Sequence, residues 1–185
     1  IQRSRGLGDV YKRQVVTFNA GPSNLSSLTV SSETINVNTA SLTTTGDQTY
    51  TGDIALQATT ELDGANINVT GGISGAASLT LDGTTDVSGT IGTDVVNLTV
   101  ETGALTAGTI DITGNLDADQ NVETDTGAIL VDGTADTEGT LIGETGVDIG
   151  GTSDLGGDVT AQANNVTLGG NVTLTADSVI TAAGT

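Results

Sequence analysis

The stretch VTAQANNVTLGGNVTL, residues 159–174, contains one short unit three times. Each unit is a triplet with an apolar residue at both ends and Thr in the middle, and a turn of small or polar residues separates it from the next. Alternation with a period of two indicates a β-strand, because successive side chains point to opposite faces. We therefore predict short strands whose outer members face a core and whose middle members face solvent.

Similar triplets recur along most of the chain, and none of its segments has the apolar spacing of an amphipathic helix. The others lie at residues 28–30, 35–37, 42–44, 54–56, 67–69, 79–81, 98–100, 110–112 and 147–149. Many steps between triplets are six or seven residues. The strands of a sandwich recur at a longer spacing of about 8 to 12 residues. The short steps predict an all-β solenoid, in which each short strand pairs with its equivalent one coil later.

Two longer repeats suggest the length of a coil. DGTTDVSGTIGTD (82–94) aligns with DGTADTEGTLIGE (132–144) at a shift of 50, and GGDVTAQA (156–163) aligns with GGNVTLTA (169–176) at a shift of 13. We predict coils of about 20 to 25 residues, so that the larger shift spans two coils. Residues 15–185 would then form roughly seven or eight coils at a spacing of about 4.8 Å.

Charge is distributed very unevenly. The chain has 23 acidic residues against 4 Lys and Arg, a formal net charge of −19, and all four basic residues lie in the first fourteen residues, IQRSRGLGDVYKRQ. Nucleic acid is therefore not an expected partner, because phosphate binding needs clustered basic residues. Divalent cations are expected partners.

No run approaches the roughly 18 apolar residues of a membrane helix, so we expect no membrane insertion.

The basic segment 1–14 differs from the rest of the chain. It lacks the apolar run of a signal peptide, because Lys12 and Arg13 interrupt it. The run GLGDVYKRQ resembles translated sequencing-adapter sequence. We expect residues 1–14 to be a non-native leader that packs poorly, and residues 15–185 to be the solenoid.

Catalytic and cofactor-binding residues are not predicted. Residues 15–185 contain no His, Cys, Lys or Arg, and their only aromatic residues are Phe18 and Tyr50, so a sugar platform is also missing. Paired carboxylates can still act as general acid and base. A polysaccharide-active β-helix enzyme therefore remains an alternative, although we expect no enzyme.

Calcium is the better chemical hypothesis, because hard cations take 6 to 8 oxygen ligands. The run DADQNVETD offers oxygen atoms at alternating positions: Asp117, Asp119, Asn121, Glu123 and Asp125. The run differs from the calcium-binding loop of a helix–loop–helix motif, because Val122 stands where that loop needs Gly and Ala128 stands where it needs a bidentate Glu. General screening of like charges by cations is the other interpretation.

Thr occupies the centre of seven of the twelve triplets. Such an array also suits ice binding, but Asp111 and Asp148 interrupt it, and Thr favours strands in any case.

The segments LTTTGDQTYTGDIAL (42–56) and ANINVTGGISGAASLTLDG (65–83) resemble the repeats of large bacterial exoproteins of the filamentous-haemagglutinin and autotransporter-passenger type. The resemblance implies a right-handed parallel β-helix that is extracellular or on the bacterial cell surface. It also implies a role as an adhesin or stalk with a glycan or host-matrix ligand. It transfers no functional residue. A calcium-dependent surface-layer or biofilm-matrix protein is the alternative.

Overall fold

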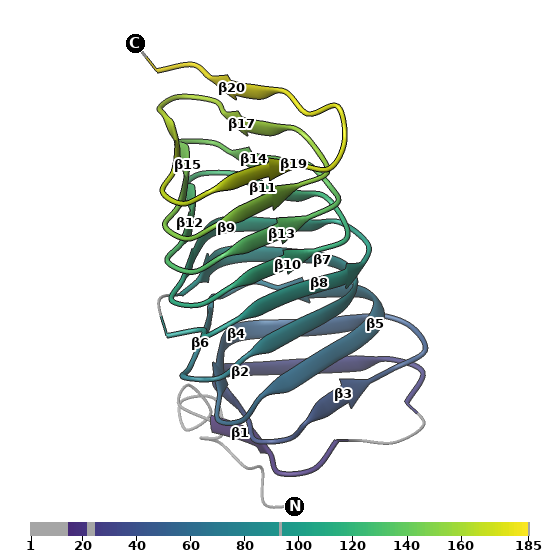
Figure 1. Cartoon of the computed structure of the whole chain (residues 1–185). Coiled ribbons are helices and arrows are strands. Elements are labelled where there is room, and N and C mark those ends of the chain that lie inside the picture. Colours follow the sequence, from purple (N-terminus) through teal and green to yellow (C-terminus); the bar gives the residue numbers. More distant parts are fainter. Residues whose placement is uncertain (1–14, 22–24, 93, 185) are drawn as a thin grey trace, which may run out of the picture.

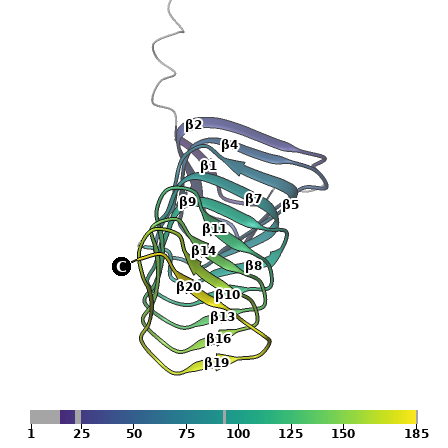
Figure 2. The same ribbon diagram turned by 90° about the horizontal axis from the view of Figure 1, so that it is seen from above.

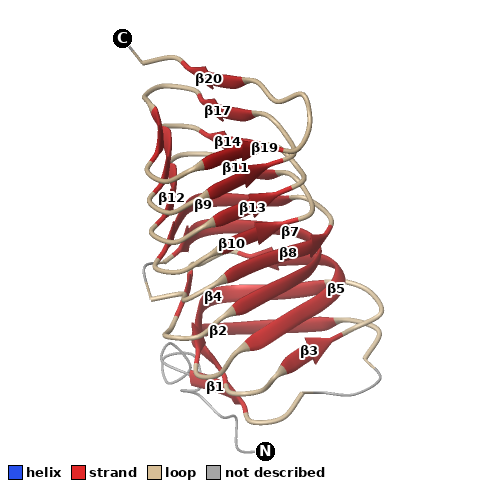
Figure 3. Cartoon of the chain, viewed as in Figure 1, coloured by secondary structure: helices blue, strands red, loops and turns tan. Residues whose placement is uncertain are grey.

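The computed structural model describes residues 15–21, 25–92 and 94–184, and throughout this part the regular structure is β-strand (Figure 3). The predicted leader, residues 1–14, lies outside the described residues.

The strands pair in parallel, each with its equivalent one coil away. Leu98 pairs with Leu116, and Leu116 pairs with Ala135. In Figure 1 the chain runs from left to right along the near face and returns behind, rising towards the C-terminus. The chain is therefore a right-handed parallel β-solenoid of about nine turns, which confirms the predicted fold class.

Each coil has three sides. Side 1 consists of β3 (Ser41–Thr43), the first parts of β5 (Thr60–Val69) and β7 (Leu79–Ile91), β8 (Leu98–Thr102), β10 (Leu116–Ala118), β13 (Ala135–Thr137), β16 (Ser153–Leu155) and β19 (Val172–Leu174). Side 2 includes the first parts of three long strands, β2 (Leu28–Val37), β4 (Gln48–Leu56) and β9 (Leu105–Ile112), and the later parts of β5 and β7. It also includes four whole strands: β11 (Val122–Thr124), β14 (Leu141–Gly143), β17 (Val159–Ala161) and β20 (Ile180–Ala182). Side 3 consists of β1 (Val15–Phe18), the second parts of β2, β4 and β9, β6 (Ile73–Ser74), the end of β7, β12 (Ala128–Val131), β15 (Gly146–Ile149) and β18 (Val166–Leu168). Figure 2 looks down on the stack and shows β13, β16 and β19 following one another along one edge.

The predicted coil length is wrong. Leu98, Leu116 and Ala135 stack in register, so the sequence advances by eighteen and then nineteen positions per coil. The steps elsewhere range from seventeen positions (Leu105 to Val122) to twenty-one (Val159 to Ile180). Each side needs only a triplet and a short corner, so three sides close in a shorter stretch of chain than expected. The chain accordingly makes about nine turns instead of seven or eight.

The internal repeats relate different sides and not equivalent ones. Asp82 belongs to a side 1 strand, whereas its counterpart in the longer repeat, Asp132, directly follows the side 3 strand β12. Likewise Val159 lies on side 2 and Val172 on side 1. The repeating unit is therefore one strand with its corner, and the longer repeat does not correspond to two coils.

The core is an apolar column made by the outer members of the triplets. Leu79, Leu98 and Leu116 stack in register, with exposures of 0%, 0% and 1%. Their burial confirms the predicted alternation, and it stabilises the fold by about 25 cal/mol per Å² of apolar surface. The triplet at β19 is an exception, because Val172 and Leu174 are exposed in the last described coil, where only one neighbouring coil covers them.

Five strands before residue 113 are much longer than the predicted triplets. β2, β4, β5, β7 and β9 continue around corners, where the pairing shifts register, as between Asp63 and Asn66. At two of these corners Gly52 and Gly83 adopt φ values of 125° and 144°, which residues with a side chain rarely adopt. These glycines allow a strand to bend without ending.

Candidate functional site: the acidic side of the solenoid

Side 1 presents one continuous outward column of polar residues. The register aligns the centres of successive strands as Glu61, Thr80, Thr99, Asp117, Asp136, Asp154 and Thr173. Paired strands lie about 4.8 Å apart, so each side chain has neighbours directly above and below it. The carboxylates on side 1, in this column and next to it, form two groups.

The first acidic group surrounds Glu61. The carboxylates of Glu61, Asp82 and Glu101 approach so closely that one oxygen of each lies within 4.8 Å of the others. Burial raises the pKa of the Glu61 carboxyl, and the negative charges of Asp63, Glu101 and Asp82 raise it further. Among residues 15–21, 25–92 and 94–184, these three are the His, Cys, Asp or Glu side chains grouped closely enough to hold a metal ion.

The second acidic group is a ladder of Asp117, Asp136 and Asp154 on β10, β13 and β16. Like charges directly opposite one another on paired strands repel. Burial raises the pKa of Asp117, and the charges of Asp136 and Asp119 add to the shift. The Oδ1 atom of Asp154 is buried and has no hydrogen-bond partner among the described residues.

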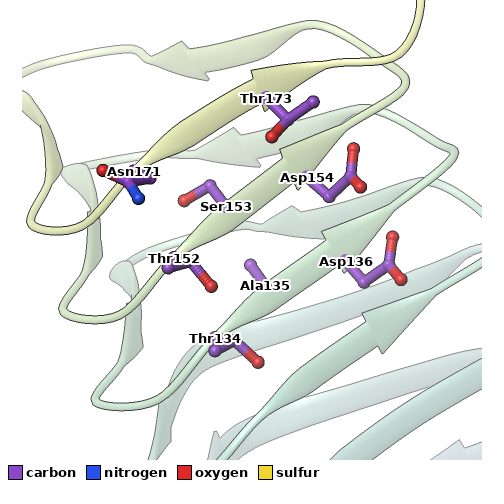
Figure 4. Close-up of a pocket in the computed structure, with 8 residues that line it drawn as sticks. All are labelled: Thr134, Ala135, Asp136, Thr152, Ser153, Asp154, Asn171 and Thr173. Carbon is purple, nitrogen blue, oxygen red and sulfur yellow. The ribbon is translucent and has the colours of Figure 1, made fainter.

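A groove of about 380 Å³ lies on the surface beside this ladder (Figure 4). Asp136 and Asp154 extend in the same direction from neighbouring strands, and Thr173 follows them on β19. Thr134, Thr152 and Asn171 lie at the starts of the same three strands. The groove therefore combines two carboxylates with a row of hydroxyl and amide groups.

The predicted calcium residues are distributed around the coil. Asp117 belongs to side 1, whereas Glu123 faces Thr106 and Ile142 on side 2. The side chain of Asn121, at the corner between them, accepts a hydrogen bond of 3.0 Å from the N–H of Thr140. Calcium binding by this set remains a prediction, and the closest carboxylate grouping is at Glu61.

The acidic groups were missed because their members are distant in sequence. Asp117, Asp136 and Asp154 each lie one full coil from the next, although the register places them side by side. The signal that could have found them is the recurrence of acidic residues at the coil length.

The parallel stacked strands define the chain as a β-solenoid. It matches no protein-family model, no curated protein and no solved structure. The described part of the chain contains no helix long and apolar enough to cross a membrane.

Proposed function

We propose that the chain is a structural and adhesive repeat segment of a secreted or surface-anchored bacterial adhesin. It acts outside the cell as a ligand-binding surface or a rigid stalk, and it has no catalytic role. The observation that carries the proposal is the unbroken parallel pairing from β1 to β20 around one apolar core. Such a stack displays extended surfaces that can bind ligands, as solenoid repeats do.

The composition of the surface supports binding without turnover. The groove beside Asp136 and Asp154 is open, and its lining contains no aromatic, His, Lys or Arg side chain. A catalytic site needs convergent groups in a pocket that excludes water. A glycan or matrix ligand that uses hydroxyl and amide contacts requires no such enclosure.

Adhesion can be tested with beads coated with the 185-residue chain, exposed to glycans and to matrix proteins, while released reducing sugar is assayed in parallel. We expect retention of at least one ligand class without sugar release. The matched control is Leu98→Asp, which places a charge in the core and should abolish both the fold and retention. Release of sugar by the native chain would contradict the proposal in favour of a polysaccharide-active enzyme.

A calcium-dependent surface-layer or matrix protein is the second candidate, because Glu61, Asp82 and Glu101 are close enough to share a cation. Folding that requires calcium, and that sodium at equal ionic strength cannot restore, would favour this candidate over the adhesin.

A further inference from the structure

The last three strands of the stack, β18, β19 and β20, form an open edge at its C-terminal end (Figure 1). Within the described part of the chain each of them pairs with a single strand, β15, β16 or β17, of the coil before. No described strand lies along their other side. An unpaired edge of this kind is a template on which another chain can add strands.

The open edge also exposes the end of the apolar core. Leu174 and Ile180 stand in register with Leu155 and Val159 of the preceding coil, which are fully buried. Four of the six large apolar side chains exposed among the described residues lie here: Val172, Leu174, Val179 and Ile180. The surface is therefore continuous with the interface that holds each coil on the next, and a further three-sided layer of strands would bury it.

The open edge lacks the charges that usually protect an exposed strand. The sequences of its strands are VTL, VTL and ITA, without a charged residue or Pro. Residues 159–184 contain one acid, Asp177, whereas residues 15–158 contain 21. Two copies of this acidic chain repel one another over most of their surface. They meet the least repulsion where two open edges face each other.

The shape of the open edge matches its own copy. Its three strands are each three residues long. Because the coil rises towards the C-terminus, β20 lies furthest out and β18 furthest in (Figure 1). A two-fold axis through the centre of side 1 would place β19 against its counterpart and β20 against β18 of the second copy, so the differences in height cancel. All the new pairs would be antiparallel, and such a contact closes at two copies.

We propose that the open edge joins two copies of the chain end to end, with Thr173 opposite the Thr173 of the second copy. This register turns Val172 and Leu174 of both copies towards the shared core, whereas a slip of one residue would turn them outward in one copy. The contact makes side 1 continuous across the two copies. It does not depend on the proposed adhesive function.

Sedimentation velocity of the 185-residue chain from about 1 to 100 μM tests the proposal, in about 0.5 M sodium chloride to screen the net charge. We expect a dimer that dissociates on dilution. Val172→Asp should weaken it at least about tenfold, because it places like charges in the apolar contact. Val96→Asp is the matched control, since Val96 is 39% exposed and Val172 is 42% exposed, but Val96 precedes β8 within the stack. It should change the dimer affinity less than about twofold.

Cross-linking tests the register without disturbing the apolar contact. The natural chain has no Cys. In the dimer, Thr173→Cys places two thiols directly opposite one another on an antiparallel pair, close enough for a disulfide under mild oxidation. Thr99→Cys lies in the same side 1 column but within the stack, so we expect it to remain uncross-linked. Equal cross-linking of both variants would overturn the proposal.

Three other outcomes also overturn it. A native chain that stays monomeric at about 100 μM does not use the open edge. Assemblies that keep growing with concentration would show that the edge meets a different surface of the next copy. A dimer that forms at low salt and dissociates in about 0.5 M sodium chloride would rest on ionic contacts of the basic residues in 1–14. None of these results bears on retention of ligands by the coated beads, so the adhesive function stands or fails separately.

Discussion

Tyr50 and Gln48 form a polar pair inside the apolar column, where both side chains are fully buried. The Tyr50 hydroxyl donates a hydrogen bond of 2.7 Å to Oε1 of Gln48, and burial raises the pKa of Tyr50. The Gln48 amide donates to the carbonyl oxygens of Leu42 and Asp63, each at 2.7 Å. The pair therefore ties two successive coils together from within.

Tyr50→Phe should destabilise the fold, because it keeps the ring but leaves Oε1 of Gln48 without its donor. We expect a loss of about 1 to 2 kcal/mol in the free energy of unfolding by urea denaturation. Unchanged stability in Tyr50→Phe would show that the buried hydrogen bond is dispensable.

Glu61 makes stability depend on pH. Because its pKa is raised in the folded state, the folded chain binds more protons than the unfolded chain as the pH falls through the raised pKa. Stability must therefore rise as the pH falls from 7 through that range, until the carboxyl is protonated in both states. Asp117, whose pKa is also raised, acts in the same direction.

Thermal unfolding from pH 7 down to about pH 4 measures this effect. Glu61→Gln should raise the melting temperature at pH 7 and flatten its dependence on pH, because the repulsion is then already relieved. Glu123→Gln, whose in-register neighbours Thr106 and Ile142 are uncharged, is the matched control and should change the slope less. A melting temperature that falls steadily on acidification would contradict this account of Glu61.

At the scale of the element, the corners determine how closely the coils stack. A side-chain Cβ at Gly133 would lie 2.4 Å from the Gly114 carbonyl oxygen and from Oδ1 of Asn115. The same Asn115 oxygen accepts a 2.9 Å hydrogen bond from the N–H of Thr134. Glycine is required here because the backbone of the neighbouring coil occupies the space of a side chain.

Gly133→Ala should therefore cost about 1 to 3 kcal/mol in the free energy of unfolding, by forcing the corner away from the coil beneath it. Gly92→Ala is the matched control, since the nearest atom to its Cβ would be the Ile73 carbonyl oxygen at 3.6 Å, an ordinary contact. Chemical denaturation of both variants provides the comparison. Equal stability of the two would mean that corner packing does not limit the stack.

Strand alternation could be predicted from sequence, but the number of strands in a coil could not. The triplet beginning at Val159 looks the same as the one beginning at Val172, although they lie on different sides. The short step between triplets gives the length of one strand with its corner. The number of strands in a coil depends instead on how sharply each corner bends. The acidic ladder of Asp117, Asp136 and Asp154 was hidden for the same reason, because its spacing is the coil length.

At the scale of the whole molecule, residues 15–185 carry 22 acidic residues and no basic ones. Several of the acids stack on side 1, so their mutual repulsion opposes the pairing that holds the coils together. Cations in solution reduce this repulsion.

Removing salt and divalent ions should therefore lower the melting temperature. Circular dichroism in chelator at low ionic strength measures the change, with sodium chloride added back as the first control and calcium at equal ionic strength as the second. Equal recovery with both salts would identify general screening, and recovery with calcium alone would identify a specific site. A transition that does not move in chelator at low salt would contradict the electrostatic account.

Each coil stacks directly on the one before it, and the distance between two spin labels on side 1 can verify this arrangement. Thr80 and Asp154 are four coils apart in the side 1 column, through Thr99, Asp117 and Asp136. The natural chain has no Cys, so Thr80→Cys with Asp154→Cys gives a uniquely labelled pair. Double electron–electron resonance should yield a narrow distribution of distances between the two labels, consistent with a Cα separation of about 19 Å. A broad distribution beyond roughly 40 Å, as in an unfolded chain, would contradict the solenoid.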